Sequence, residues 1–303
     1  MGAQYRVPVA VIVFNRVELA KKMLKCLEKI QPEQLFVISD GAREHVSGEK
    51  EKVEKVRALF EEIPWPCKVY KNYADQNMGC DNRVPSGIDW VFGQVEQAVI
   101  LEDDCIPSDD FFRYSENMLE RYKDNHSVMM IAGSNYMQNY KMRDCCCFSA
   151  RVYTWGWATW KRAWECYNED EEVWKQIKKD GTLAQIYPFR IRHFVKKELD
   201  YYYERGKCPW DYLWWVSCMR YQGLCAVPSV NLISNQGFGE DATHTQDQGS
   251  YDGQTYSMEF PLKYPARVER DHQIDKYDWE INRPWLIVRA MRKLMRIVKS
   301  HQR

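Results

Sequence analysis

Four short segments with strand-like patterns alternate with amphipathic stretches over the first hundred residues. VPVAVIVFN (7–15), LFVISD (35–40) and AVILEDD (98–104) are apolar almost throughout, whereas CKVYKN (67–72) alternates apolar and polar residues. Between them, apolar side chains recur at helical spacing, as over residues 16–30 and 48–62. Runs this rich in β-branched residues are typical of buried parallel strands. The alternation predicts βαβ units and an α/β fold, Rossmann-like, with a mostly parallel central sheet flanked by helices.

The pattern changes after residue 105. The sequence predicts a helix at DDFFRYSENMLERYK, a strand at VMMIAGSNY, polar helices over residues 169–207, a buried helix at WDYLWWVSCMRYQG and a strand and loop at LCAVPSVNLISNQG. A dense aromatic stretch lies before the polar helices. Since there are no repeats and no low-complexity linker, we expect the two halves, 1–105 and 106–265, to pack as one unit, followed by a basic tail over 266–303.

The overall charge excludes one class of partner. The 303 residues include 43 basic and 43 acidic side chains, a net charge of +0, so the molecule as a whole is not built to attract nucleic acid. The 11 cysteines are odd in number and show no metal-binding spacing, which favours free thiols in a reducing cytoplasm. No secretory signal or apolar run of transmembrane length is evident.

The chemistry concentrates in the stretch VILEDDCIPSDDFF. Glu102, Asp103 and Asp104 directly follow a strand that is expected to be buried. Carboxylates gathered at the carboxyl end of a parallel sheet are tolerable if a hard divalent cation lies among them, and Mg²⁺ or Mn²⁺ is held by one or two carboxylates together with diphosphate oxygens. Asp109 and Asp110 open the next helix, where acids favour the helix N-terminus, so we interpret them as helix-start residues rather than ligands.

These motifs resemble a known family. VPVAVIVFNR, the strand ending at Asp40, the NMGCDNR loop and LEDDCIPSDDFF are together similar to the nucleotide-sugar domain of GT-A glycosyltransferases. The resemblance is closest to the N-acetylglucosaminyltransferase I type and to bacterial proteins grouped loosely in glycosyltransferase family 2. It covers residues 7–115 well and continues more weakly to about 245. It implies a nucleotide-sugar-binding first half and an acceptor or catalytic second half.

The resemblance also implies roles for individual residues. Asp104 would hold Mn²⁺ or Mg²⁺, and Asp103 would lie against the ribose and the donor sugar. The other implied donor contacts are Arg16, Asp40, Asn77, Asn82 and Glu102. One position departs from the animal enzymes, because Asn15 stands where they have Asp before the arginine.

In the second half, Asp211 follows Trp210 at the start of a helix, where the family places its catalytic base. An inverting transfer needs one carboxylate to take the proton of the acceptor hydroxyl. Asp211 also suits the start of a helix, and both roles can hold together. Trp157 in TWGWATWKRAW could stack on a sugar or fill the core. His244 in GFGEDATHT could reach the metal or the diphosphate, or be an ordinary loop residue.

The basic tail leaves two interpretations open. From Pro284 onward, apolar residues fall on one side of a predicted helix and Arg and Lys on the other, which suits either an anionic membrane surface or docking on the protein.

The sequence therefore favours a metal-dependent inverting glycosyltransferase that uses a nucleotide diphosphate sugar. A UDP-sugar such as UDP-N-acetylglucosamine is the favoured donor, and the acceptor would be a glycan or a lipid-linked glycan, for example in bacterial polysaccharide biosynthesis. Such an enzyme would be cytoplasmic and could lie peripherally on the membrane. One alternative is a nucleotidyltransferase that makes a sugar nucleotide, although VFNRVELAKK lacks the Gly-rich basic loop of that class. Another is a non-catalytic carbohydrate-binding or membrane-associated module.

Overall fold

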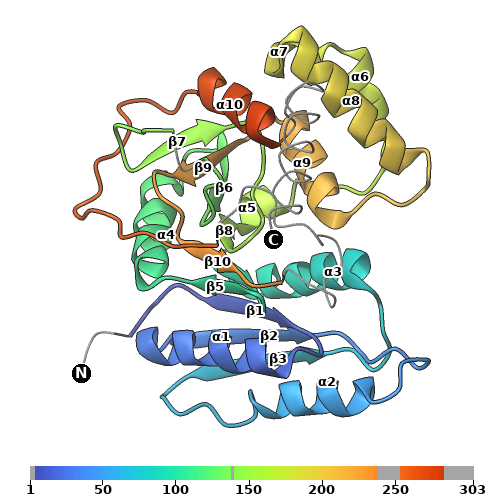
Figure 1. The fold of residues 1–303 in the computed structure, drawn as a ribbon, viewed down its shortest axis with the longest axis vertical. Helices are drawn as coiled ribbons and strands as arrows, with labels where there is room; N and C mark the ends of the chain where they lie inside the picture. Colours follow the sequence, from blue (N-terminus) through green and yellow to red (C-terminus); the bar gives the residue numbers. More distant parts are fainter. Residues whose placement is uncertain (1–3, 138–139, 238–252, 283–303) are drawn as a thin grey trace, which may run out of the picture.

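The computed structural model describes residues 4–137, 140–237 and 253–282 (Figure 1). Its strands are β1 (Val9–Val13), β2 (Gln34–Ser39), β3 (Lys68–Tyr73), β4 (Gln97–Glu102), β5 (Cys105–Pro107), β6 (Val128–Ala132), β7 (Cys146–Ser149), β8 (Trp157–Trp160), β9 (Leu224–Pro228) and β10 (Ile233–Asn235). Its helices are α1 (Val17–Ile30), α2 (Glu49–Ala58), α3 (Cys80–Phe92), α4 (Asp109–Tyr122), α5 (Lys161–Trp164), α6 (Glu171–Lys179), α7 (Thr182–Ile186), α8 (Phe189–Tyr203), α9 (Trp210–Arg220) and α10 (His272–Asn282).

The central sheet has eight strands in the order β3-β2-β1-β4-β8-β6-β9-β7. β3, β2, β1 and β4 run parallel, so their carboxyl ends lie along one edge. β8 then runs antiparallel to both β4 and β6, while β6 and β9 are parallel. The predicted α/β class with a mostly parallel sheet is therefore confirmed. The sheet takes strands from both the 1–105 and the 106–265 parts of the chain.

Helices cover both faces of this sheet. On one face α1, α2 and α4 bury residues such as Met23, Val56 and Met118 against β1, β2 and β4. On the other face α3 and α9 bury Ile88 and Trp214 against the same strands and β8. Each such apolar side chain contributes about 1.5–3 kcal/mol when it is fully buried. This two-sided burial explains why β1, β2 and β4 are apolar almost throughout.

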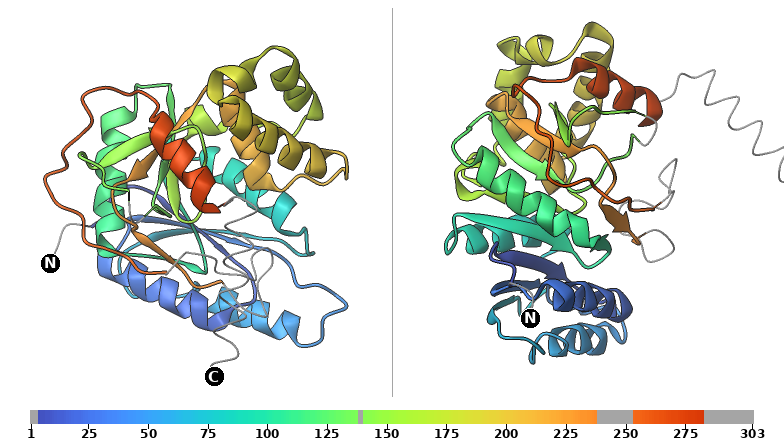
Figure 2. Two further views of the ribbon diagram at one scale, coloured as in Figure 1. Left: turned by 45° about the horizontal axis from the view of Figure 1, so that its top comes forward. Right: turned by 90° about the vertical axis from the view of Figure 1, so that its left-hand side faces the viewer.

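The aromatic stretch before the polar helices forms strands that the sequence pattern did not predict. Trp157–Trp160 is β8, which lies between β4 and β6, and Cys146–Ser149 is β7 at the sheet edge. The predicted polar helices over 169–207 are confirmed as α6, α7 and α8. They pack on α9 through a separate apolar cluster that contains Trp174, Leu199 and Trp215. In Figures 1 and 2 these three helices lie beyond α9, away from the strands.

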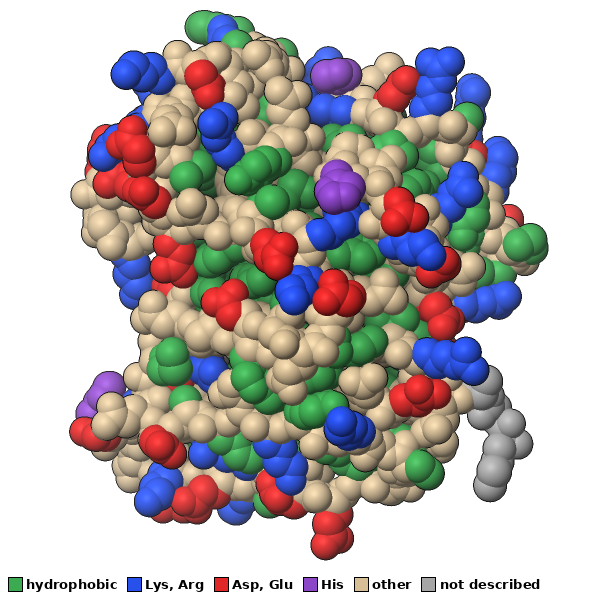
Figure 3. All heavy atoms as spheres, turned by 180° about the vertical axis from the view of Figure 1, so that it is seen from behind, with side chains coloured by type: hydrophobic (Ala, Val, Ile, Leu, Met, Phe, Trp, Pro, Cys, Tyr) green, Lys and Arg blue, Asp and Glu red, His purple; other side chains and the backbone are tan. Residues whose placement is uncertain are grey.

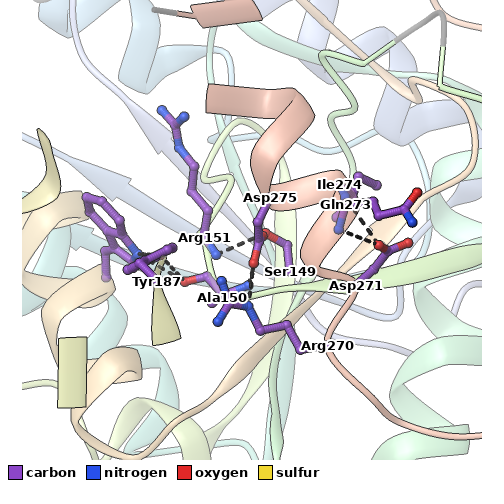
Figure 4. Close-up of polar contacts among 10 residues, drawn as sticks. Ser149, Ala150, Arg151, Tyr187, Arg270, Asp271, Gln273, Ile274 and Asp275 are labelled. Atoms are coloured by element: carbon purple, nitrogen blue, oxygen red, sulfur yellow. Dashed lines mark hydrogen bonds and ion pairs between the residues drawn. The ribbon is translucent and has the colours of Figure 1, made fainter. Parts of the chain in front are cut away.

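A buried polar cluster fixes α10 to the edge of the sheet (Figure 4). The hydroxyl of Ser149 donates to Oδ1 of Asp275 at 2.6 Å, and Arg270 forms an ion pair with the other oxygen of that carboxylate. Arg151 forms a second ion pair, at 2.5 Å, with the buried carboxylate of Asp278. Because charges removed from water must be paired, these contacts specify how α10 packs against the edge of the sheet.

The amphipathic helix predicted from Pro284 lies outside the described residues, so that prediction is not tested. In the part of the chain that the structure describes, no helix combines the length and the apolar character needed to cross a membrane.

Candidate functional site

The acidic stretch lies where the sheet's parallel strands end. β4 ends at Glu102, and Asp103 and Asp104 follow before the short strand β5. Arg16, which immediately precedes α1, reaches across from the end of β1. Its guanidinium lies 3.0 Å from Oδ1 of Asp103 and 2.6 Å from Oδ2 of Asp104. Arg16 and the acidic cluster therefore lie side by side, because each follows one of two neighbouring parallel strands.

Asp103 is the most deeply buried of the three acids. Its side chain is 2% exposed, and its second carboxylate oxygen, Oδ2, has no hydrogen-bond partner. A buried carboxylate oxygen without a partner is costly, because it has lost its contacts with water. An oxygen left in this state at the edge of a sheet is suited to accept a hydrogen bond from a ligand hydroxyl.

The cluster carries more negative charge than Arg16 neutralises. Burial, followed by the charges of Asp104 and Asp103, raises the pKa of Glu102 to about 8. Burial likewise raises the pKa of Asp103 to about 7, although Arg16 opposes the shift. Burial is the largest cause of both shifts, and the charge of Asp104 adds to each, so a cation placed nearby would lower both pKa values.

A divalent cation is compatible with this cluster, because three carboxyl groups lie near one guanidinium. Asp104 is partly exposed, and its carboxylate contacts Arg16 and the thiol of Cys105. Among the described residues no group of three or more His, Cys, Asp or Glu side chains is arranged to hold a metal ion. Mg²⁺ or Mn²⁺ bound here would therefore need oxygens from a diphosphate, as is usual when one or two carboxylates are the only protein ligands.

Asp40 ends β2 at the same edge, but protein groups already use its carboxylate. Oδ1 accepts hydrogen bonds from the backbone N–H groups of Gly41 and Met78, and Oδ2 accepts from the side chain of Asn77 and the N–H of Gly79, all at 2.9–3.0 Å. These four bonds fill the usual acceptor sites of a carboxylate. Asp40 therefore organises the 76–79 loop, and any contact with a donor base would come from that loop.

Asn77 and Asn82 lie on either side of the start of α3. The amide of Asn77 also donates to the carbonyl of Gly41 at 2.8 Å, so its NH₂ group is engaged within the loop. Asn82 is exposed in the first turn of α3 and donates to the carbonyl of Met78 at 3.0 Å. Their predicted contact with a donor remains a proposal.

Asn15, the position that departs from the animal enzymes, is hydrogen-bonded to Glu49. Its amide donates to Oε1 of Glu49 at 2.9 Å. Glu49 is itself 2% exposed and is bound by the backbone and guanidinium of Arg43. The hydrogen bond from Arg43 is the largest cause that lowers the pKa of Glu49 to about 2. The ion pair holds Glu49 in place, and the hydrogen bond from Asn15 to Glu49 ties the residue before Arg16 to it.

Asp211 lies in the first turn of α9, which packs against α3. The two helix N-termini meet near the acidic cluster: the charge of Asp211 adds to the rise in the pKa of Glu102. Burial, then Asp211 and Asp81, raises the pKa of Cys208 to about 12. The fold thus brings Asp211 within electrostatic reach of Glu102, 109 residues earlier in the chain.

Trp157 does not lie where a sugar could stack on it. Its side chain is 1% exposed and packs among Trp164, Trp210 and Trp214, with ring centroids 6.1–6.3 Å apart. We therefore correct the predicted sugar contact: Trp157 supports Trp210 and the start of α9 from within the core. Gly156, just before it, has φ +63°, as expected for a tight turn, and a Cβ there would clash with Ile233.

The structure adds one residue to the site that the sequence analysis did not single out. β10 pairs with β5 antiparallel, and the chain leaves it at Gln236, whose N–H donates to the carbonyl of Asp104 at 2.8 Å. A Cβ on Gly237 would lie 2.1 Å from Oδ2 of Asp104 and 3.1 Å from the guanidinium of Arg16. A larger residue at this position would force Asp104, Arg16 or the loop to shift. His244, later in the chain, lies outside the described residues.

Comparison with known proteins gives only distant structural likeness. No protein-family model matches, and no curated protein matches. Among solved structures, a cytidylyltransferase from Leptospira borgpetersenii shares 10% identity at a TM-score of 0.33, covering 67% of this chain and 73% of its own. A 4-diphosphocytidyl-2C-methyl-D-erythritol synthase from Anaerococcus prevotii shares 8% at 0.31, covering 67% and 84%. A CMP:2-keto-3-deoxy-manno-octonic acid synthetase shares 10% at 0.33, covering 59% and 87%.

The names of these neighbours correspond to the nucleotidyltransferase alternative rather than to glycosyltransferases. Identities and TM-scores this low do not carry an activity to this chain. A proposal on function must therefore rest on the site itself.

Proposed function

We propose that this chain is a glycosyltransferase that takes its sugar from a nucleotide diphosphate sugar with the help of Mn²⁺ or Mg²⁺. The observation that carries the proposal is the buried Asp103, whose Oδ2 has no partner, beside the Arg16–Asp104 ion pair at the carboxyl end of β4. Open α/β sheets bind their ligands at this edge. A UDP-sugar such as UDP-N-acetylglucosamine is the favoured donor, by resemblance.

Asp103, Arg16 and Asp104 would each contact a different part of the donor. Asp103 would accept a hydrogen bond from a ribose or sugar hydroxyl, which removes the cost of its unpartnered oxygen. Arg16 would turn from the carboxylates toward the phosphates, where a guanidinium can bind two oxygens at once. Asp104 would hold the cation, which when bound neutralises the diphosphate and stabilises it as a leaving group.

Asp211 is the proposed base of an inverting transfer. It would take the proton from the acceptor hydroxyl while that oxygen attacks the anomeric carbon and the bond to the diphosphate breaks. Glu102, whose pKa is raised by burial, lies within electrostatic reach. A neutral Glu102 would leave Asp211 as the carboxylate that accepts the proton. The proposed acceptor is a glycan or a lipid-linked glycan.

The nucleotidyltransferase alternative needs room for a nucleoside triphosphate after the first strand. β1 ends at Val13 and α1 begins at Val17, so only Phe14, Asn15 and Arg16 connect them. None is glycine, and a connection this short offers few backbone N–H groups to a triphosphate. We therefore place glycosyl transfer first.

A donor panel separates these activities. UDP-, GDP- and dTDP-sugars are incubated with the chain and Mn²⁺, and the free nucleoside diphosphate is quantified. In parallel, nucleoside triphosphates are incubated with sugar 1-phosphates, and pyrophosphate is measured. Glycosyl transfer predicts release of one nucleoside diphosphate that stops when EDTA is added. Pyrophosphate formation would support the alternative, and donor binding without turnover would support a binding module.

A further inference from the structure

The outer face of α8 has a composition unlike a typical solvated helix. Phe189 is 72% exposed, Phe194 45% and Tyr201 48%. The inward face, with Ile191, Val195 and Leu199, is fully used in packing against α6, α7 and α9. Large aromatic side chains therefore project from a helix whose packing needs are already met, and contiguous exposed apolar surface is typical of sites that bind a protein or a membrane.

Cations are interspersed with these aromatic side chains. Arg190, Phe194, Lys197 and Tyr201 follow one another at spacings of four, three and four residues, so they form one stripe along the helix. Arg205, in the turn after α8, lies over the ring of Tyr201 at 3.9 Å. The stripe alternates positive charge with apolar ring surface.

The acids of the same segment are largely engaged elsewhere. Glu198 accepts a hydrogen bond from the hydroxyl of Tyr212 at 2.9 Å. Asp200 accepts from Trp174 and from Lys178, at 2.9 and 2.7 Å. Within residues 189–207, all of which the structure describes, Glu204 is the one exposed acid. The outward charge of this segment is therefore positive.

This excess is local. The molecule carries a net charge of +0, and on the face shown in Figure 3 acidic and basic side chains are interspersed. A cationic aromatic helix on an otherwise balanced protein complements an anionic surface that also accepts apolar groups. A lipid bilayer with anionic headgroups meets both requirements, since aromatic rings enter the interface while Lys and Arg contact the headgroups.

We propose that the outer face of α8, defined by Phe189, Arg190, Phe194, Lys197 and Tyr201, is a docking surface for an anionic membrane. α8 leads through the turn at 204–209 directly into α9, whose first turn carries Asp211. Docking by this face would hold that end of the molecule near the bilayer. The inference rests on the surface of α8 and is independent of the proposed function.

Sedimentation with lipid vesicles tests the proposal on the full chain. Wild type is expected to bind vesicles of phosphatidylglycerol and phosphatidylcholine, to lose binding as salt rises, and not to bind phosphatidylcholine alone. Lys197→Gln, which removes one charge from the stripe, should weaken binding about fivefold. Phe194→Ser with Tyr201→Ser should weaken it to a similar extent.

Matched controls isolate α8. Lys52→Gln with Lys55→Gln removes two exposed charges from α2, and Tyr221→Ser removes an aromatic side chain that is 62% exposed beyond α9. Both control variants should bind like wild type, and circular dichroism should show that all variants are folded. A variant with Arg292→Gln, Lys293→Gln and Arg296→Gln measures the contribution of the tail separately.

Several results would overturn the proposal. This face would be excluded if the variants in α8 bound vesicles as tightly as wild type, or if they lost no more binding than the control variants. If only the Lys substitution mattered, and a soluble acidic polysaccharide bound as well as vesicles, the face would bind an anionic polymer instead.

Discussion

The guanidinium of Arg16 lies 2.6 Å from Oδ2 of Asp104, although the two residues are 88 positions apart in the chain. In this arrangement Arg16 supplies part of the positive charge that the carboxylates require. It cannot balance the cluster, because Glu102 and Asp103 keep raised pKa values caused first by burial. The buried carboxylates whose ionisation destabilises the fold are also those proposed to bind the donor. A substitution that removes such a charge should therefore raise stability and weaken donor binding.

Asp103→Asn tests that opposition. The pKa of Asp103 in the folded chain is raised to about 7 from an ordinary value of 3.8, so ionisation above the ordinary value destabilises the fold. The variant lacks this penalty. Its unfolding free energy relative to wild type should therefore rise as pH increases from about 4 to about 8, as measured by urea unfolding in the presence of EDTA.

The same variant should bind donor poorly. Losing one charged acceptor is expected to raise the KM for the nucleotide sugar by about tenfold or more. Asp109→Asn is the matched control: Asp109 lies in the same acidic stretch but is exposed at the start of α4. It should leave the KM unchanged and should cost about 0.3–1 kcal/mol of stability, with no increase relative to wild type as pH rises from about 4 to about 8. Equal effects of both substitutions would remove Asp103 from the site.

Asp211→Asn should separate binding from transfer. An amide keeps the shape of the side chain but cannot accept the acceptor's proton, so turnover should fall by on the order of 100-fold or more. Donor affinity, measured by calorimetry, should remain within about twofold of wild type.

Glu171→Gln controls for the effect of removing an acid from the first turn of a helix, here α6. It should cost about 0.3–1 kcal/mol of stability and leave turnover unchanged. Full turnover by Asp211→Asn would show that the carboxylate serves only the helix.

Gly237→Ala should damage the site without unfolding the chain. The added Cβ would lie 2.1 Å from Oδ2 of Asp104, so Asp104, Arg16 or the loop must move. We expect metal-dependent donor binding to weaken and the melting temperature of the protein to stay unchanged. Gly93→Ala, where the nearest atom would be at 3.4 Å, is the control and should behave like wild type. Unchanged donor affinity in Gly237→Ala would show that this contact has no role in binding.

The Glu49–Arg43 pair predicts an acid-sensitive element with the opposite pH dependence to Asp103. The hydrogen bond from Arg43 is the largest cause that lowers the pKa of Glu49 from 4.5 to about 2. Its contribution to stability is therefore complete above about pH 4.5 and is lost as pH falls toward 2.

Glu49→Gln should destabilise the chain by about 1–2 kcal/mol at neutral pH, allowing for the exposure of Arg43. The difference from wild type should shrink below about pH 4. Thermal unfolding across this range provides the measurement, and a difference that does not depend on pH would contradict the ion-pair assignment.

The first half of the fold follows from local sequence pattern. β1, β2 and β4 are apolar runs of five or six residues that read as buried strands, and β3 shows the alternation of a partly exposed edge strand. The helix at Asp109–Tyr122 was also predictable, because its acids and its apolar stripe agree. The placement of Arg16, Asp40 and Glu102–Asp104 along one edge follows directly from parallel strands.

The remaining features depend on contacts that no local pattern reports. β5 and β10 have three residues each, too short for any periodicity, yet their pairing brings Gly237 onto Asp104. Trp157 belongs to a strand within an aromatic-rich segment, where composition alone cannot separate a core residue from a sugar contact. Three of the four hydrogen bonds to Asp40 likewise arise only once residues 77–79 fold back onto β2.

Calorimetric titration of UDP into the chain, with and without Mn²⁺, tests the central claim most directly. Wild type should bind UDP substantially more tightly when Mn²⁺ is present, and Asp104→Asn should lose that difference while its melting temperature stays close to that of wild type. UDP affinity that is unaffected by Mn²⁺ in wild type, or equally enhanced by Mn²⁺ in Asp104→Asn, would contradict a metal-assisted nucleotide-sugar site at the end of β4.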